Sequence, residues 1–265
     1  MLLMEAAFFD LDKTLISRAS SFAMAGPMYR EGWLSRRALA RGVFAQLTFI
    51  LIGADERRLD RAKEAMLKIT RGWEQAQVER LAREVVVDVI DPFIYAEAVE
   101  LILEHRREGR PSVIVSSSPE EIVRPIAAHV GADHVIATRA EVVDGRYTGR
   151  VERYCVGAEK ASAIRVFADE HHIDLDGSYA YSDSHSDLPM LEAVGHPVAV
   201  NPSTELRRVA EARGWPVLHF HRQVRESVVN PGRIAIVAGA IVVAGAAVWF
   251  GIRRFRRLAS GSGEE

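Results

Sequence analysis

Short apolar stretches alternate with longer stretches of helical periodicity over most of the chain. The apolar stretches predict β-strands at residues 5–9, 111–116, 134–138, 178–182, 196–200 and 215–220. The helical periodicity predicts helices at residues 96–108, 119–130, 158–171, 187–194 and 203–213. Strands that are apolar on both faces and alternate with helices are typical of a parallel sheet covered by helices. We therefore expect an α/β fold with a Rossmann-like parallel sheet core.

Two segments depart from this alternation. Residues 16–90 have helical periodicity and almost no strand character, and they are too long for an ordinary connection between two strands. We interpret them as an inserted helical cap, with residues 1–15 and 91–221 forming the α/β core. Residues 141–151, with the sequence EVVDGRYTGRV, instead predict a small β-hairpin with the Asp-Gly pair at its turn.

The carboxyl-terminal segment differs in composition from the rest of the chain. Residues 234–252, IAIVAGAIVVAGAAVWFGI, carry no charge, and a helix needs about 20 such residues to cross a bilayer. Arg233 precedes this run and four arginines follow it, which favours a transmembrane helix over a buried helix of the globular domain. We expect a single-pass membrane anchor here. A juxtamembrane linker at 222–233 precedes it, and a basic, then disordered tail at 253–265 follows it.

The orientation of this anchor stays open at the level of sequence. The first residues, MLLMEAAFF, lack a basic region and include Glu5, so they do not resemble a secretory signal, and we expect the catalytic domain in the cytoplasm. The arginines after the helix also favour the cytoplasmic side, so either the short tail crosses against this bias or the segment does not span in the simple way. Small residues at four-residue spacing, such as Ala235 and Gly239, are compatible with a homodimer formed through the anchor.

Composition narrows the range of partners. The 265 residues have a net charge of −2, with 48% hydrophobic and 26% charged residues. This balance gives no electrostatic reason to expect a nucleic-acid partner. The single Cys155 excludes an internal disulfide and has no cysteine partner for a metal cluster.

Residues with the chemistry of phosphoryl transfer lie at the ends of predicted strands or at the start of a predicted helix. These residues are Asp10 and Asp12 in FFDLDKTL, Ser116, Ser117 and Ser118 after VIV, Lys160, and Asp183 and Asp187 in YSDSHSDLPML. Ligands bind at the carboxyl ends of the strands in a parallel sheet, so we expect these groups to meet. Together they provide oxygen ligands for a divalent cation, hydroxyl donors and a positive charge. Each alone is more often a cap, a turn residue or a surface group.

The order of these motifs, DxDxT, then hydrophobic-hydrophobic-Ser, then Lys, then (G/S)DxxxD, resembles the haloacid dehalogenase superfamily. The chain is most similar to the branch that contains phosphoserine phosphatase and its relatives. The resemblance covers about residues 5–220 and includes DPFIYAEAVELILEHRREG, VIATRAEVVDGRYTGRV, DLPMLEAVGHPVAVNP and GWPVLHF. It implies the fold of that superfamily with an inserted helical cap, and a phosphatase that uses Mg²⁺.

The resemblance implies a role for each acidic residue. Asp10 is the nucleophile that attacks phosphorus and becomes a transient aspartyl phosphate. Asp12 is the general acid for the leaving oxygen and then the general base for the attacking water. The metal is bound by Asp10, the backbone oxygen of Leu11 and Asp183. Asp187 supports these ligands, and Asp12 belongs to the second layer of residues around the metal.

The resemblance also implies a set of phosphate-binding residues. Ser116, Ser117 and Lys160 hold phosphoryl oxygens, and Thr14 belongs to this group while it stabilises the turn of the first motif. A carboxylate that attacks a phosphate dianion is repelled by it, and Lys160 and Mg²⁺ would reduce this repulsion. Ser118 lies directly before PEEIV, where the alternative prediction is a cap for the next helix.

Three positions depart from the pattern of phosphoserine phosphatases. Ala19 replaces the glutamate that meets the substrate amine in that branch, so phosphoserine is not favoured as the substrate. Ser182 replaces the usual glycine before the last motif, which we expect to be tolerated. Ser186 replaces an asparagine, and we expect this change to alter the water around the metal.

The leading hypothesis is a membrane-tethered, Mg²⁺-dependent phosphomonoesterase. Its substrate is a small phosphate metabolite or a lysophospholipid phosphate such as lysophosphatidate. The apolar stretch VFAQLTFILI at 43–52 is then either a core helix of the cap or a contact for an acyl chain. Two alternatives are a phosphotransferase or mutase of the same superfamily and a catalytically silent, membrane-anchored scaffold. A scaffold has no need for a buried cluster of charges, because such a cluster costs free energy.

Overall fold

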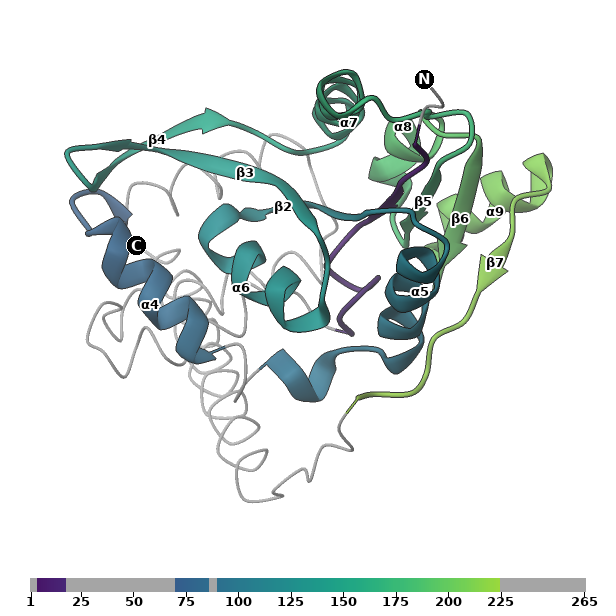
Figure 1. The fold of residues 1–265 in the computed structure, drawn as a ribbon, viewed down its shortest axis with the longest axis horizontal. Helices are drawn as coiled ribbons and strands as arrows, with labels where there is room; N and C mark the ends of the chain where they lie inside the picture. Colours follow the sequence, from purple (N-terminus) through teal and green to yellow (C-terminus); the bar gives the residue numbers. More distant parts are fainter. Residues whose placement is uncertain (1–3, 18–69, 86–89, 225–265) are drawn as a thin grey trace, which may run out of the picture. The chain divides into compact units, whose positions relative to one another are not determined.

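The computed structural model describes residues 4–17, 70–85 and 90–224 (Figure 1). The chain divides into two compact units, Met1–Arg225 and Glu226–Glu265, and every described residue belongs to the first.

The strands of this part form a seven-stranded sheet in the order β4-β3-β2-β1-β5-β6-β7 (Figure 1). Their bounds are β1 Ala7–Phe9, β2 Ser112–Pro119, β3 His134–Val143, β4 Arg146–Arg153, β5 Tyr179–Ser182, β6 His196–Val200 and β7 Val217–Leu218. All neighbouring strands are parallel except β3 and β4, which are antiparallel. The predicted α/β fold with a mostly parallel sheet is confirmed, and the first strand of the chain lies at its centre.

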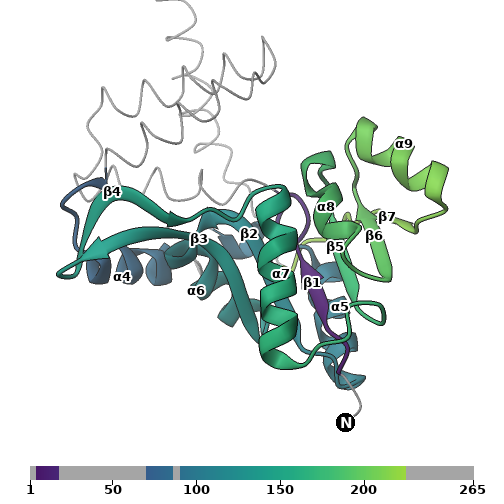
Figure 2. The same ribbon diagram turned by 90° about the horizontal axis from the view of Figure 1, so that it is seen from above.

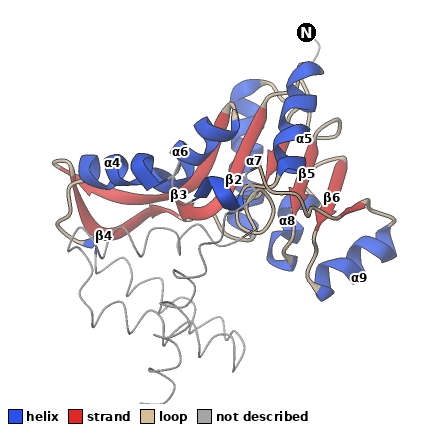
Figure 3. Ribbon diagram, turned by 90° about the horizontal axis from the view of Figure 1, so that it is seen from below, coloured by secondary structure: helices blue, strands red, loops and turns tan. Residues whose placement is uncertain are grey.

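Helices cover both faces of the sheet (Figures 2 and 3). Their bounds are α4 Gln75–Val85, α5 Ala96–Arg107, α6 Glu120–Val130, α7 Ala158–His171, α8 Leu188–Leu191 and α9 Thr204–Arg213, with 3₁₀ turns η2 Asp91–Phe93 and η3 His185–Asp187. α5 and α6 contribute to the hydrophobic cluster on one face, and α7, α8 and α9 contribute to the cluster on the other.

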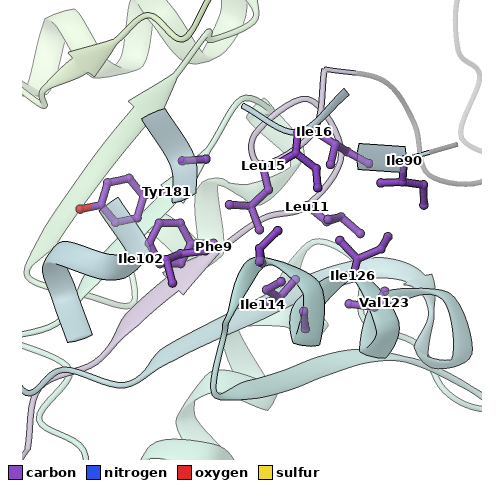
Figure 4. Packing of buried hydrophobic residues seen from close by; sticks show 14 of the residues in the cluster. Phe9, Leu11, Leu15, Ile16, Ile90, Ile102, Ile114, Val123, Ile126 and Tyr181 are labelled. Carbon is purple, nitrogen blue, oxygen red and sulfur yellow. The ribbon is translucent and has the colours of Figure 1, made fainter. Parts of the chain in front are cut away.

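The alternation of side chains along the strands separates the two clusters. Phe9 and Ile114 point to one face, where they pack with Ile102 of α5 (Figure 4). Phe8 and Val113, the neighbours of these residues in the chain, belong to the cluster on the other face. Burial of a large apolar side chain contributes roughly 1.5–3 kcal/mol. Packing on both faces therefore fixes β1, and with it the loop that follows Phe9.

Most predicted boundaries agree with the structure to within a few residues, and the exceptions have a local cause. The hairpin at 141–151 is confirmed, because Asp144 and Gly145 have φ angles of 49° and 73° between the antiparallel strands β3 and β4. The strand predicted at 134–138 continues to Val143, since it also forms the first arm of this hairpin. The helix predicted at 187–194 is instead a 3₁₀ turn followed by the short helix α8.

Part of the predicted cap at 16–90 is described. Its helix α4 packs against α6, and the residues before it are hydrogen-bonded to the hairpin. The Gly72 N–H donates to the Tyr147 carbonyl at 2.8 Å, and the Tyr147 N–H donates to the Trp73 carbonyl at 3.1 Å. This end of the segment is therefore attached to the edge of the sheet.

The other carboxyl-terminal and cap predictions fall largely outside the described residues. The anchor at 234–252, the tail at 253–265 and the apolar stretch at 43–52 lie outside them completely, and only residues 222–224 of the linker lie inside. Within residues 4–17, 70–85 and 90–224, no helix has the length and apolar character needed to cross a membrane.

His105 lies inside the core between α5 and the sheet. Its Nδ1 accepts a hydrogen bond from Nε of Arg110 at 2.8 Å, and its Nε2 lies 2.8 Å from the Tyr181 hydroxyl. The side chain is 3% exposed, and burial, together with the charge of Arg110, lowers the pKa of His105 to about 4. His105 is therefore neutral in the folded protein near pH 7.

This low pKa predicts a pH dependence of stability. As pH falls from about 6.5 to about 4, the unfolded chain binds a proton at His105 before the folded chain does, so stability is lost in that window. We expect the wild-type protein to lose roughly 2–3 kcal/mol more than His105→Gln between these pH values. Urea unfolding of both proteins near pH 7 and near pH 4.5 measures the difference. His219→Gln, at an exposed position, should follow the wild type; equal pH slopes for wild type and His105→Gln would contradict the assignment.

Candidate active site

Lys160 joins two buried carboxylates at the carboxyl end of the sheet. Its Nζ donates to Oδ1 of Asp10 at 2.6 Å and to Oδ2 of Asp187 at 2.8 Å. The three residues are 2%, 6% and 4% exposed, respectively. Three of the motifs that are far apart in the sequence therefore meet in direct contact, as their order predicted.

A glycine allows Lys160 to reach this position. Gly157 precedes α7 with φ 56° and ψ −120°, a conformation that side chains with a Cβ rarely adopt. The chain turns here from the segment after β4 into α7, so that Lys160 lies in the first turn of the helix. The order of the motifs does not include this glycine, although the position of Lys160 depends on it.

Asp183 and Thr14 connect the last motif to the first. The Asp183 N–H donates to Oγ1 of Thr14 at 3.1 Å, and Thr14 is fully buried. The contact fits the expected role of Thr14 in stabilising the turn of the first motif. Beside it, the Ser182 hydroxyl donates to Oδ2 of Asp187 at 2.8 Å, so the residue in place of the usual glycine holds an active-site carboxylate.

The serines at the end of β2 lie beside Asp12. The Ser118 hydroxyl donates to Oδ2 of Asp12 at 3.1 Å, and the Ser118 N–H donates to Oγ of Ser116 at 3.1 Å. Ser116 is buried, while Ser117, the next residue of the strand, is exposed. The N-cap of α6 is Pro119 and has no side-chain cap, so the prediction of Ser118 as a helix cap is wrong. Its position one residue beyond the predicted phosphate-binding serines was the signal for its role at the site.

Burial makes this site electrostatically costly. It raises the pKa of Asp10 above its usual range, an effect that the Lys160 ammonium opposes and Asp187 reinforces. Burial likewise raises the pKa of Asp183 to about 6. For Lys160, burial favours the neutral form, but Asp10 and Asp187 more than offset it and raise the pKa. Lys160, together with Lys13 beside Asp183, therefore balances the three buried carboxylates incompletely.

The Leu11 carbonyl does not fit its expected role as a metal ligand. It accepts hydrogen bonds from the N–H groups of Leu15 at 2.9 Å and Ile16 at 3.1 Å. These two bonds use both lone pairs of the oxygen and close the turn after β1. The structure therefore argues against this residue as a ligand, because its oxygen is already part of the turn.

The remaining acidic residues have the chemistry of a Mg²⁺ site. Asp10, Asp183 and Asp187 supply only carboxylate oxygens, which are the ligands that Mg²⁺ prefers. Burial, reinforced by the charge of Asp187, raises the pKa of Asp183, and a divalent cation would favour the charged form of these carboxylates. As their side chains are placed, no three His, Cys, Asp or Glu residues of the described ranges converge on one point. Asp10 and Asp187 are turned toward Lys160 instead.

The expectations about Ser186 and Ala19, which depart from the pattern of phosphoserine phosphatases, are not tested by the structure. Ser186 is exposed, and its hydroxyl lies 2.9 Å from the hydroxyl of Ser184, within the loop between the two aspartates. Its effect on water around a metal stays a prediction. Ala19 lies outside the described residues.

Comparison with known proteins gives consistent results. The family model described as haloacid dehalogenase-like hydrolase matches residues 7–192. A probable phosphatase of Mycobacterium tuberculosis (strain H37Rv) is 47% identical over 257 residues, which cover 94% of this chain and 90% of that protein. A phosphoserine phosphatase of the same strain is 32% identical over 217 residues, covering 81% of this chain and 70% of that protein.

A solved structure has the same architecture. The crystal structure of a protein of unknown function from Bordetella pertussis Tohama I matches with a TM-score of 0.73 and 32% identity. The match covers 82% of this chain and 99% of that chain. The predicted resemblance to the phosphoserine-phosphatase-like branch is confirmed by these comparisons.

The charge balance at Lys160 predicts a large loss of stability for one substitution and little change for another. In EDTA, Lys160→Met leaves Asp10 and Asp187 buried without their cation, and we expect a loss of about 3–5 kcal/mol in unfolding free energy. Asp10→Asn removes a buried charge while Lys160 keeps Asp187, so we expect a change within about 1 kcal/mol. The loss in Lys160→Met should be smaller near pH 5 than near pH 8, because protonation then neutralises the carboxylates.

Urea unfolding in EDTA measures all three proteins. Arg165→Met, at an exposed position of the same helix, is the matched control and should change stability little. A loss in Lys160→Met no larger than in this control would show that the lysine does not stabilise the buried carboxylates.

Proposed function

Because the chain belongs to the haloacid dehalogenase-like hydrolase family, in its phosphatase branch, we propose that it hydrolyses a phosphomonoester through an aspartyl phosphate on Asp10. The observation that carries this proposal is the contact of the Asp10 carboxylate with Lys160 at the end of the central strand, with Asp12 two residues further on. A nucleophile, a cation and a proton carrier lie around one site.

The residues of the chain divide the reaction between them. The Asp10 carboxylate attacks phosphorus, while Asp12 gives a proton to the leaving oxygen of the alcohol. Water, deprotonated by Asp12, then attacks the aspartyl phosphate and releases inorganic phosphate. The Ser118 hydroxyl, which donates to Asp12, orients that carboxyl group for both transfers.

Lys160 and the serines at the end of β2 interact with the phosphoryl group. The Lys160 ammonium beside Asp10 offsets the repulsion between the nucleophile and the phosphate. Ser117 is exposed near the end of β2 and is available to phosphoryl oxygens, whereas the adjacent Ser116 is buried. When bound by Asp10, Asp183 and Asp187, Mg²⁺ would supply the further positive charge that the transition state needs.

The substrate is proposed to be a phosphomonoester other than phosphoserine. Ala19 cannot provide the carboxylate that would meet the amine of phosphoserine. A small phosphate metabolite and a lysophospholipid phosphate both fit the proposed chemistry. Hydrolysis is favoured over transfer to another acceptor, because the relative that is 47% identical is described as a phosphatase.

The proposed phosphatase is tethered to the membrane by residues 234–252, with its catalytic unit in the cytoplasm. This proposal rests on the uncharged run and the arginines that flank it. The small residues Ala235 and Gly239 would allow two anchors to pair as a homodimer.

The catalytic proposal predicts the loss of phosphate release when its groups are removed. Asp10→Asn should lower kcat at least about a thousandfold, because an amide is not a nucleophile here. Ser118→Ala should lower kcat about tenfold by leaving Asp12 less well oriented. EDTA should abolish turnover and Mg²⁺ should restore it.

Phosphate release from a panel of phosphoserine, sugar phosphates, nucleotides and lysophosphatidate measures these effects and identifies the substrate class. Ser162→Ala, an exposed serine of α7, is the control and should keep full activity. Full activity of Asp10→Asn would exclude the aspartyl phosphate, and full activity in EDTA would exclude the metal.

The tether predicts different partition of two proteins. The full-length chain should float with liposomes in a density gradient, whereas the chain ending at Arg225, which is the first compact unit, should stay in the soluble fraction. Full-length Asp10→Asn should float like the wild type. A full-length chain that stays soluble would refute the tether without affecting the proposed reaction.

A further inference from the structure

Residues 220–224, here named the strap, follow β7 and run beside the segment before α5 (Figure 1). The Ala96 N–H donates to the Arg222 carbonyl at 2.9 Å, and the Val224 N–H donates to the Ile94 carbonyl at 2.9 Å. These bonds make an antiparallel pair centred on Tyr95 and Gln223. The strap therefore adds a short strand to a segment that is distant in the sequence.

The Glu97 carboxylate binds the middle of the strap. Oε1 of Glu97 accepts the N–H of His221 at 3.0 Å and the N–H of Arg222 at 2.9 Å. The Arg222 guanidinium in turn lies 3.5 Å from Glu97 and donates to Glu100 at 2.7 Å. Charged acceptors of backbone N–H groups form strong hydrogen bonds, so Glu97 holds the strap at the start of α5.

Asn201 binds Phe220, the first residue of the strap. Its amide nitrogen donates to the Phe220 carbonyl at 3.2 Å, and its amide oxygen accepts the Phe220 N–H at 3.0 Å. Asn201 has a φ of 43°, which is unusual for a residue other than glycine. Phe220 is buried, and its ring lies 5.8 Å from that of Tyr95. Asparagine adopts a positive φ more readily than most residues, so it can take this conformation and still make both side-chain bonds.

Asn201 and Tyr95, which contact the strap, are each connected to one acidic loop of the active site. These loops carry Asp183 and Asp10. From Asn201, the chain continues to Ser203, whose N–H donates to the Asp183 carbonyl at 2.8 Å. From Tyr95, the N–H donates to the Leu15 carbonyl at 3.0 Å, directly after the first motif. The bond from Asp183 to Thr14 closes the ring. The strap thus completes a circuit of hydrogen bonds that passes through Asp183 and through Thr14 and Leu15, shortly after Asp10 in the chain.

We propose that the strap sets the position of the Asp183 loop relative to the Asp10 loop, and that Glu97 and Asn201 are positioning residues for the reaction. The inference rests on the proposed function for its consequence in catalysis. Misplacement of catalytic groups by about 1 Å can cost up to a hundredfold in rate. Glu97 and Asn201 bind backbone groups of the strap, so their effect on the reaction passes through the two loops.

Hydrogen–deuterium exchange on the full-length protein, in EDTA and without substrate, tests the positioning directly. In Glu97→Ala and Asn201→Asp, exchange should rise at least about fivefold at Asp183 and Ser203 as well as within the strap. Asn201→Asp keeps the acceptor for Phe220 N–H but loses the donor and sets a negative charge against the Phe220 carbonyl. Because it tolerates the same φ, it keeps the test decisive if Glu97→Ala does not fold.

Kinetics on the preferred substrate provide the second measurement. Both variants should lower kcat about tenfold and change KM less than about twofold, while Glu97→Gln, which keeps an acceptor oxygen, should recover most of kcat. Arg213→Ala removes an exposed ion pair with Glu192 elsewhere on the surface and is the matched control, with no change expected in exchange at Asp183 or in kcat.

The outcomes separate this inference from the proposed function. Faster exchange confined to the strap, with the Asp183 loop unchanged, would overturn the positioning role and leave the strap as a surface seal. A wild-type protein without phosphatase activity would refute the proposed function, and the exchange data would still decide whether the strap positions the loop.

Discussion

The contacts of the Lys160 ammonium with Asp10 and Asp187 are the interaction on which the whole carboxyl edge of the sheet depends. Removing these charges from water costs several kcal/mol for each ion, and only close pairing with further hydrogen bonds offsets it. The Ser182 hydroxyl supplies one such bond to Asp187. The loops that carry these groups can approach one another only as an assembled set, because any one carboxylate buried alone would be strongly unfavourable.

The hydrophobic core provides the rigidity that this pairing requires. β1 lies between β2 and β5, and Phe8 and Phe9 are buried on opposite faces of the sheet. A strand held on both faces and both edges cannot shift its register without moving a large side chain out of a packed environment. Asp10 follows directly and its N–H donates to the Tyr181 carbonyl, so the strand bearing the proposed nucleophile is bonded to the strand that leads to Asp183.

The sequence predicted what depends on periodicity and motif order, and it failed where single hydrogen bonds decide. The parallel sheet, the hairpin and the meeting of Asp10, Lys160 and Asp187 all follow from patterns that span many residues. The lone pairs of the Leu11 carbonyl and the partner of the Ser118 hydroxyl depend instead on the local path of two turns. No pattern of residue types specifies such paths, because serine caps a helix as readily as it contacts a carboxylate.

The strap is likewise held by single hydrogen bonds, so no pattern in the sequence predicts it. Its position nevertheless matches what the repulsion between the carboxylates of the site requires. Lys160 and Lys13 balance the three buried carboxylates incompletely, so the acidic loops repel one another. Their separation is resisted by Lys160, by the bond from Asp183 to Thr14 and by the bond from the Asp10 N–H to the Tyr181 carbonyl. Residues 220–224 restrain both loops from outside, through bonds to Asn201 and through bonds to residues 94–97, which are distant in the chain. Restraint from outside leaves the interior free for oxygen ligands, a cation and a phosphoryl group, which bonds across the interior would have to displace.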